Sequence, residues 1–406
     1  MMTMFRKRVR LTGTTVSLFV GLLIMTACGG KKTASAVEEA TVMGDSSTLI
    51  RPQYAKGFSV KYLEDGVRLV EVEDPQQDKD KMPISYQFAL VPKGSDATVP
   101  EGYTKVEVPV SRTIVMTMLQ LSNFTALDAH EVVKGITGTK NLFNKDIKQR
   151  VKDGRIVKIG MEGEFDPELI LAANPEVIFI SPFKRGGYDA IKETGITLIP
   201  HLGYKELEAL GQAEWVKFVG LFIGKEKEAN ELFAGIESRY NSLKLKVKRL
   251  RVGEQSSGMS LKLKDFPTVF SGEMHGGNWY AVGGKNFLAQ LFRDAGAEYI
   301  IKNEDTGGSN IEFEQMYAMA ANADYWRILN SYPDTFSYEA LKASEPRNAL
   351  FKAFKEKKVI YCNMKQTPYY ESTPVEPDVV LKDLLAIFHP DLVEKDYQPK
   401  YYQLLK

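Results

Sequence analysis

Residues 225–251 read KEKEANELFAGIESRYNSLKLKVKRLR, and this stretch decides the fold. Its large apolar side chains recur at spacings of three and four, which predicts one apolar stripe along an amphipathic helix. The stripe consists of Leu232, Phe233, Ile236, Tyr240, Leu243 and Val247. No proline interrupts the pattern, so the helix would extend roughly 40 Å at 1.5 Å per residue. Such a helix is either a surface helix of one domain or a connector between two, and its flanks favour the connector.

Strand-like and helix-like patterns alternate on both sides of this helix. Before it, strands are expected in residues 111–117, 176–180 and 197–200, with helices at 118–129, 167–175, 188–193 and 206–222. After it, strands are expected at 268–271, 325–329 and 359–361, with helices in 283–296, 310–322, 348–357 and 377–388. Alternation of this kind is typical of mainly parallel sheets covered by helices. We therefore predict an α/β protein with two lobes, 109–222 and 252–406, joined by one long helix at 223–251.

A different pattern precedes the first lobe. From Phe58 the chain alternates polar and apolar residues, and Asp65-Gly66 divides two such runs, which is a hairpin signal. Residues 84–91 and 103–110 are further strand candidates. Residues 55–108 thus form a small β segment added to the first lobe.

The N-terminus carries a secretory leader. A basic start is followed by the apolar run Leu18–Met25, which is too short to span a membrane comfortably, and then by Met25-Thr-Ala-Cys28-Gly. Small residues before a cysteine resemble the lipobox of bacterial lipoproteins. The resemblance implies cleavage before Cys28 and lipidation of that residue. Residues 28–54, small and polar, are then a tether.

Charge and cysteine content exclude some functions. Removal of residues 1–27 takes four of the 53 basic groups, so 49 remain against 52 acidic groups, a formal charge of −3. This gives no electrostatic case for nucleic acid binding. Cys362 is then the remaining thiol, which excludes an intrachain disulfide and a thiolate metal site.

Catalytic and nucleotide-binding motifs are missing from the sequence. There is no Gly-x-Gly-x-x-Gly, no complete phosphate loop and no Gly-x-Ser-x-Gly elbow. The four histidines do not have metal-ligand spacing, so neither a dedicated metal site nor an enzyme is expected.

Four stretches carry a family resemblance. They are RTIVMT at 112–117, DPELI at 166–170 with NPEVI at 174–178, WYAVGG at 279–284 with DAGA at 294–297, and PDVVLKDL at 377–384 with His389-Pro390. In this order, around a long helix and behind a lipobox, they resemble the substrate-binding proteins of ABC importers for iron–siderophores, haem and cobalamin. The resemblance covers about residues 109–392. It implies two lobes with a shallow ligand cleft at the strand ends.

The resemblance also implies two permease-docking acids and no resident cofactor. In that family one glutamate on each lobe pairs with arginines of the permease. The matching positions here are Glu168 and Glu314, although Glu312 lies two residues from the second. Two such pairs at a fixed spacing would set orientation more than affinity.

Candidate ligand contacts lie in loops that follow strand ends. Aromatic side chains there offer flat contact area, and Lys184 and Arg185 suit an anionic chelate. The candidates are Met118, Gln120, Met161, Phe183, Lys184, Arg185, Tyr204, His275, Trp279, Tyr280, Tyr369 and Tyr370. Trp279 and Tyr280 lead this set. Arg327 lies in a strand, where a structural ion pair is favoured.

We therefore expect a monomeric, lipid-anchored periplasmic protein that captures a metal chelate and delivers it to an ABC permease. An iron–siderophore leads, and cobalamin or haem is the nearest alternative. A surface interaction lipoprotein using an exposed edge of the β segment, or a metal chelatase, would be a different class of function.

Overall fold

The computed structural model describes residues 48–77, 85–138, 142–161, 164–182, 188–252 and 266–406. The leader, Cys28 and the start of the tether lie outside these residues, as do Phe183, Lys184 and Arg185 of the expected ligand set.

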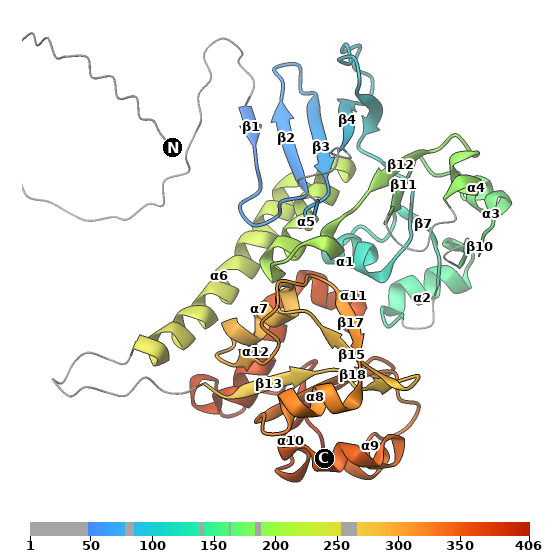
Figure 1. The fold of residues 1–406 in the computed structure, drawn as a ribbon. Coiled ribbons are helices and arrows are strands. Elements are labelled where there is room, and N and C mark those ends of the chain that lie inside the picture. The colour runs from blue at the N-terminus through green and yellow to red at the C-terminus, as the bar shows by residue number, and fades with distance from the viewer. Residues whose placement is uncertain (1–47, 78–84, 139–141, 162–163, 183–187, 253–265) are drawn as a thin grey trace, which may run out of the picture. The chain divides into compact units, whose positions relative to one another are not determined.

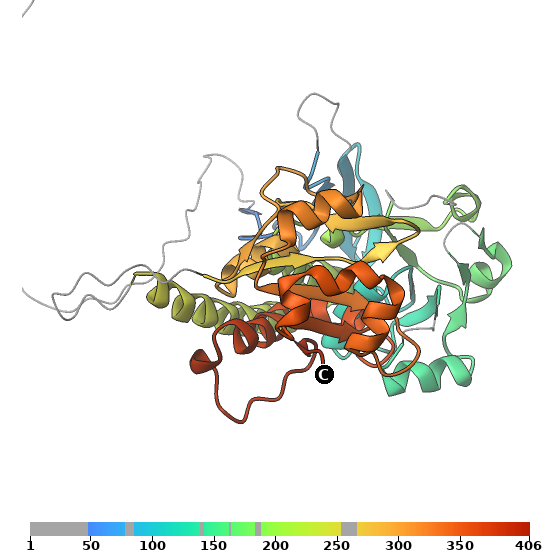
Figure 2. The ribbon, with the colours of Figure 1, turned by 60° about the horizontal axis from the view of Figure 1, so that its bottom comes forward.

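The central helix is α6, Glu226–Val252, and the predicted connector is confirmed. It begins after Gly224, whose left-handed φ of 71° ends the preceding helix α5, Ala209–Ile223. Its buried face, which includes Phe233 and Tyr240, packs on α5 toward the first lobe and on α12, Pro377–Phe388, toward the second. Figures 1 and 2 both show α6 running beside these two helices. The helix therefore belongs to both lobes.

The N-terminal lobe is built around a five-stranded sheet in the order β12-β11-β6-β7-β8, and each neighbouring pair is parallel. Its elements are β6 Thr113–Val115, α1 Met118–Ala126, β7 Val133–Ile136, α2 Lys145–Lys152, β8 Val157–Lys158, β9 Gly160–Met161, β10 Glu164–Phe165, α3 Pro167–Ala172, β11 Val177–Ile180, α4 Asp189–Lys192 and β12 Thr197–Pro200. The parallel arrangement agrees with the alternating sequence pattern.

The C-terminal lobe repeats this plan with the strand order β16-β13-β18-β19-β20, in which the β19–β20 pair is antiparallel. Its elements are β13 Thr268–Ser271, β14 Met274–His275, β15 Asn278–Val282, α7 Phe287–Asp294, β16 Glu298–Tyr299, β17 Gly308–Ile311, α8 Phe313–Ala320, β18 Tyr325–Asn330, α9 Tyr338–Ser344, α10 Lys352–Lys355, β19 Val359–Asn363, α11 Tyr369–Ser372, α12 and β20 Gln403–Leu404. A small antiparallel sheet, β14-β15-β17, lies beside it. The helix expected from residue 310 begins only at Phe313, because β17 pairs with β15 first.

The β segment is an ordered five-stranded sheet in the order β1-β2-β3-β4-β5. Its strands are β1 Thr48–Ile50, β2 Phe58–Tyr62, β3 Arg68–Glu73, β4 Ser85–Pro92 and β5 Thr104–Val108. The Asp65-Gly66 hairpin is confirmed, with Gly66 at a φ of 81°. The predicted end of the tether at residue 54 is wrong, because β1 already pairs with β2.

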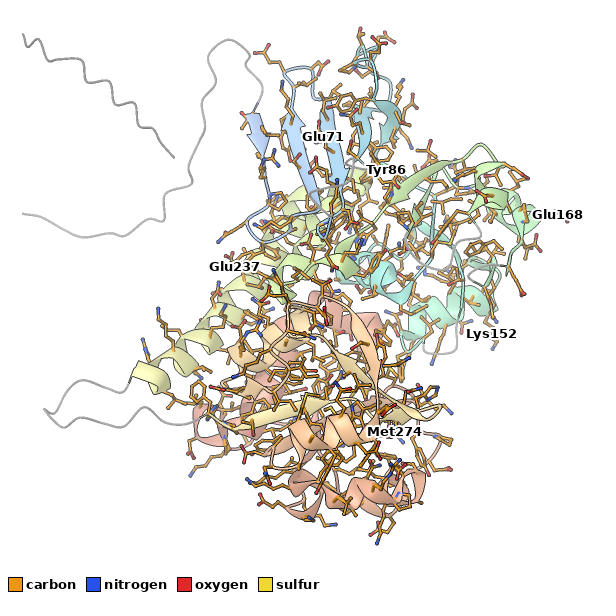
Figure 3. All side chains as sticks on the ribbon, viewed as in Figure 1. Glu71, Tyr86, Lys152, Glu168, Glu237 and Met274 are labelled. Atoms are coloured by element: carbon orange, nitrogen blue, oxygen red, sulfur yellow. The ribbon has the colours of Figure 1, made fainter. Side chains whose placement is uncertain are left out.

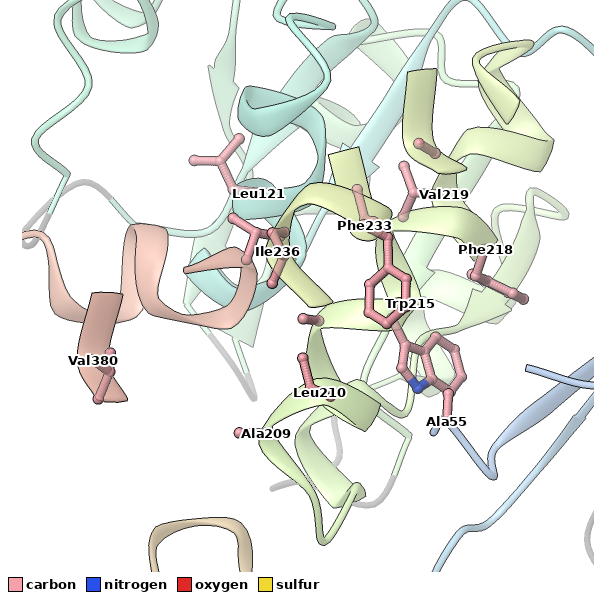
Figure 4. Close-up of a cluster of buried hydrophobic side chains, with 14 of the residues drawn as sticks. Ala55, Leu121, Ala209, Leu210, Trp215, Phe218, Val219, Phe233, Ile236 and Val380 are labelled. Carbon is pink, nitrogen blue, oxygen red and sulfur yellow. The ribbon is translucent and has the colours of Figure 1, made fainter. Parts of the chain in front are cut away.

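One hydrophobic core connects these parts. Figure 4 shows Ala55 of the β segment against Trp215 of α5, with Ile236 of α6 and Val380 of α12 in the same cluster. The Trp215 ring lies 5.0 Å from that of Phe58 in an edge-to-face contact. The β segment is therefore packed into the body of the protein.

Candidate functional site

The two lobes meet beside two helices that carry expected ligand contacts, α1 with Met118 and α11 with Tyr369 and Tyr370. In open parallel sheets, ligands bind outside the carboxyl ends of strands where the strand order reverses, here beside β6 and β11 in one sheet and β13 and β18 in the other. Helix α11 of the second lobe packs against α1 of the first. Its Glu371 accepts a hydrogen bond from the backbone N–H of Asn144 at 2.7 Å, so the lobes are joined at this level.

Gln120 was predicted to contact the ligand, but the structure gives it a role within the lobe instead. It is 1% exposed and its side chain builds the start of α1. The amide oxygen accepts from the N–H of Met116 at 2.7 Å, and the amide nitrogen donates to the hydroxyl of Ser181 at 3.2 Å. Together with Thr117 it forms a capping box. Its hydrogen-bonding groups are therefore used within the lobe.

Three other N-terminal candidates keep accessible surface to different degrees. Met161 is 68% exposed on the β9–β10 hairpin. Met118 and Tyr204 are half-buried and pack against the core from the start of α1 and from the turn after β12. These three remain predicted contacts.

Strand β15 carries the two leading predicted contacts, Trp279 and Tyr280, and places them on opposite faces. Trp279 is completely buried among aromatic side chains, and its indole N–H donates to the carbonyl of Ser271 at 3.1 Å. Its neighbour Tyr280 points to the other face of the strand and is 52% exposed. Trp279 therefore offers no surface to a ligand and is withdrawn, whereas Tyr280 and the exposed His275 of the adjoining hairpin stay.

Arg327 lies in a strand, as predicted, but the sequence did not reveal its partners. It is 7% exposed, in the middle of β18. Its guanidinium donates to the hydroxyls of Tyr402 at 3.0 Å, Ser271 at 3.3 Å and Tyr369 at 3.4 Å. Among the residues that the structure describes, none forms an ion pair with it, so the expected structural ion pair is wrong. The only sequence signal was a single cation inside the apolar run YWRILN.

The two adjacent tyrosines of α11 have different roles. Tyr369 is buried, and its hydroxyl accepts from Tyr402 at 2.9 Å beside Arg327, so it is a supporting residue and not a free contact. Tyr370 is 43% exposed. Desolvation of its hydroxyl nevertheless raises the pKa of Tyr370, with a smaller upward effect from Tyr369 and a lowering by the charge of Arg327.

Glu273 is a half-buried acid that interacts with the charge of Arg327. Burial raises the pKa of Glu273, while a hydrogen bond from Asn330 at 3.2 Å and the charges of His275 and Arg327 lower it in part. The net effect is a raised pKa for Glu273. The site therefore combines the buried cation of Arg327 with the exposed rings of Tyr280 and Tyr370.

A cavity of about 410 Å³ elsewhere in the C-terminal lobe is not assigned to the ligand. It is lined by residues 284–285, 293, 297–299 and 301–304, none of them a predicted contact. Lys285 pairs with Glu304 at 3.0 Å and Lys302 pairs with Glu298 at 3.2 Å, so most of its charges are already satisfied.

Both predicted docking acids are exposed near helix N-termini. Glu168 lies in the first turn of α3 at the outer end of the N-terminal lobe, as Figure 3 shows. Glu314 lies in the first turn of α8, but it pairs with Arg347 at 2.8 Å. Glu312, also exposed, precedes that helix without a side-chain cap bond. If Glu314 docks to the permease, its ion pair with Arg347 must be broken or shared with a permease arginine.

The sequence pattern of the periplasmic binding protein family matches residues 116–365. The chain belongs to this family. It is 28% identical over 364 residues to an uncharacterized lipoprotein of Methanocaldococcus jannaschii, a match that covers 84% of this chain and 82% of that protein. In the described part of the chain, no helix has the length and apolar character needed to cross a membrane.

Solved structures share the two-lobed fold. A periplasmic binding protein from Veillonella parvula aligns with a TM-score of 0.55 at 12% identity, covering 79% of this chain and 98% of that chain. A periplasmic heme binding protein from Pseudomonas aeruginosa also gives 0.55, at 15% identity, covering 73% and 98%. At such identities the likeness shows the fold alone.

The lipoprotein match extends beyond the family pattern. Covering 84% of 406 residues means a span of about 341, which must begin at or before about residue 66. The family pattern begins at residue 116. Most of the β segment therefore lies inside the region that this chain shares with that lipoprotein.

Proposed function

We propose that this periplasmic binding protein captures an anionic metal chelate and delivers it to an ABC permease. The leading candidate for the chelate is a ferric siderophore, and the protein is anchored to a membrane through Cys28. The observation that carries the proposal is Arg327, a buried cation within β18 whose guanidinium, among the described residues, hydrogen-bonds to hydroxyl groups alone. A buried cation without a counter-ion is costly, and an anionic ligand nearby would offset that cost. The exposed rings of Tyr280 and Tyr370 supply contact area for a large ligand.

The test is calorimetric titration of the purified protein with a ferric catecholate siderophore, a ferric hydroxamate siderophore, haem and cobalamin. Arg327→Met should weaken binding of the anionic chelate at least about tenfold, a change of about 1.4 kcal/mol. Arg293→Met, at an exposed arginine of the same lobe, is the matched control and should bind normally.

Because Arg327→Met alters a buried cluster, Tyr280→Ala gives a second test at an exposed position. It should weaken binding without changing the thermal midpoint. If none of the four ligands binds the unaltered protein, the proposal fails. Equal affinity in the Arg327→Met and Arg293→Met variants would also contradict it.

A haem-binding function is the second candidate, and two exposed side chains favour it. His275 lies at the β14–β15 hairpin and Met161 at the β9–β10 hairpin, and imidazole and thioether groups both ligate haem iron in proteins. Haem bound in this way should lose its absorption signature in a His275→Ala or Met161→Leu variant, whereas a ferric siderophore should bind both variants unchanged.

Delivery requires contact with the permease, for which Glu168 and Glu314 remain the proposed acids. Their exposure supports the proposal, and the Arg347 pair of Glu314 makes Glu312 a competing choice for the second lobe.

A further inference from the structure

The β segment is fixed to the N-terminal lobe by two buried carboxylates. Glu214 accepts from the backbone N–H groups of Gln53, Tyr54 and Ala55 at 3.2, 2.8 and 3.0 Å. Glu206 accepts from the next two N–H groups, those of residues 56 and 57, at 2.9 and 3.0 Å. Charge-assisted bonds to buried carboxylates are among the stronger ones in proteins. The sheet therefore has a defined position relative to α5, as Figure 1 also shows.

The turn after β3 reaches one of the predicted ligand loops. Asp74 forms an ion pair with Lys205, which ends the short helical turn Gly203–Lys205 after β12. The side-chain amide of Gln76 donates to the carbonyl oxygen of Lys205 at 2.6 Å. Tyr204, a predicted ligand contact, lies within this turn.

The same amide also reaches the C-terminal lobe. The oxygen of Gln76 accepts from the hydroxyl of Thr306 at 2.8 Å. Thr306 is held within its own lobe, because the neighbouring carbonyl of Gly307 accepts from Gly283 at 2.8 Å. Two residues later β17 begins its pairing with β15, the strand that carries Tyr280.

We propose that Gln76 is a positioning residue of the ligand site: it joins the Gly203–Lys205 turn of one lobe to the Thr306 loop of the other and so fixes the spacing between Tyr204 and Tyr280. The identity of the ligand rests on the proposed function, whereas the link between the lobes exists without any ligand. The amide serves both contacts, since its nitrogen donates to one lobe and its oxygen accepts from the other. The β segment then acts as a third part of the binding unit.

The test measures the interlobe distance in the full chain, extracted in detergent and free of ligand. Spin labels are placed at Lys152→Cys on α2 and Lys355→Cys on α10, both exposed. The native Cys362 is buried, and burial raises the pKa of its thiol to about 12, which keeps it unreactive toward the label. The label distances are then compared among the variants.

Gln76→Ala and Thr306→Val each remove one side of the link and should broaden the distance distribution. Gln87→Ala is the matched control, because the Gln87 amide donates within the β segment, to Glu71 at 3.5 Å. Release of the ligand found by calorimetry should be about fivefold faster in the two link variants, the effect of one neutral hydrogen bond.

Distances in Gln76→Ala and Thr306→Val that match those of Gln87→Ala would overturn the proposal, even if ligand binds. Broadened distances in a protein that binds none of the four ligands would support the link and overturn the proposed function instead.

Discussion

Glu176 offers a stability prediction whose size and sign follow from its contacts. Its carboxylate accepts from the N–H of Ser111 at 2.5 Å, from the N–H of Arg112 at 3.1 Å and from the ammonium of Lys93 at 2.9 Å. Desolvation raises its pKa, but these donors outweigh it and lower the pKa from 4.5 to about 2. Because Lys93 follows β4, the interaction ties the β segment to the first strand of the N-terminal lobe.

The expected effect of Glu176→Gln is a loss of about 2 kcal/mol in the free energy of unfolding at pH 7. The difference of roughly 2.5 between the unfolded and the folded pKa of Glu176 corresponds by linkage to about 3.4 kcal/mol of stability. The side chain is 23% exposed, so solvent screening reduces this to about 2 kcal/mol.

The pH dependence distinguishes charge from packing. The folded pKa of Glu176 lies below the unfolded one, so its stabilisation is complete above pH 4.5 and is lost as the pH falls toward 2. Urea unfolding at pH 7 and pH 3 should therefore show a difference between wild type and Glu176→Gln that shrinks by more than half at pH 3. Glu107→Gln, at an exposed carboxylate paired with Lys105, is the control and should change little. A difference of equal size at both pH values would refute the electrostatic account.

Three further predictions concern the site and its surroundings. Gly308→Ala should weaken ligand binding about tenfold with little loss of stability, because an added Cβ would come 2.2 Å from the Tyr280 hydroxyl; calorimetry and thermal unfolding check both parts. Trp279→Phe should cost about 2–4 kcal/mol in urea unfolding yet leave ligand affinity unchanged, because the side chain is buried and donates to a carbonyl. In a permease pull-down, Glu314→Ala should lose more binding than Glu312→Ala if the family position holds, and the reverse result would move the docking acid to Glu312.

The architecture was predictable because its signals are local and repeated. The stripe on α6 and the alternation of strands and helices depend on spacing within about 25 residues, and both appeared as expected. The hairpin at Asp65-Gly66 was equally local. By contrast, β1 has three exposed residues, and only its pairing with β2 marks it as a strand.

The site was harder to predict because burial depends on partners far away in the chain. Trp279 and Tyr280 are neighbours with similar side chains, and the pairing of β15 with β14 and β17 decides which of them faces solvent. The surroundings of Arg327 depend on Tyr402, 75 residues away. An argument from residue type and loop position therefore cannot tell a buried side chain such as Trp279 from its exposed neighbour Tyr280.

The β segment changes how the binding unit should be defined. The family pattern begins at residue 116, yet the lipoprotein match begins at or before about residue 66. The contacts of Glu206 and Glu214 explain why this addition is not separable: two carboxylates of the N-terminal lobe are buried at the cost of their hydration, and backbone N–H groups of residues 53–57 offset that cost. Without the β segment the lobe would keep two carboxylates lacking those donors. A binding unit that begins at the family boundary would thus be destabilised at α5, next to the turn on which Gln76 acts.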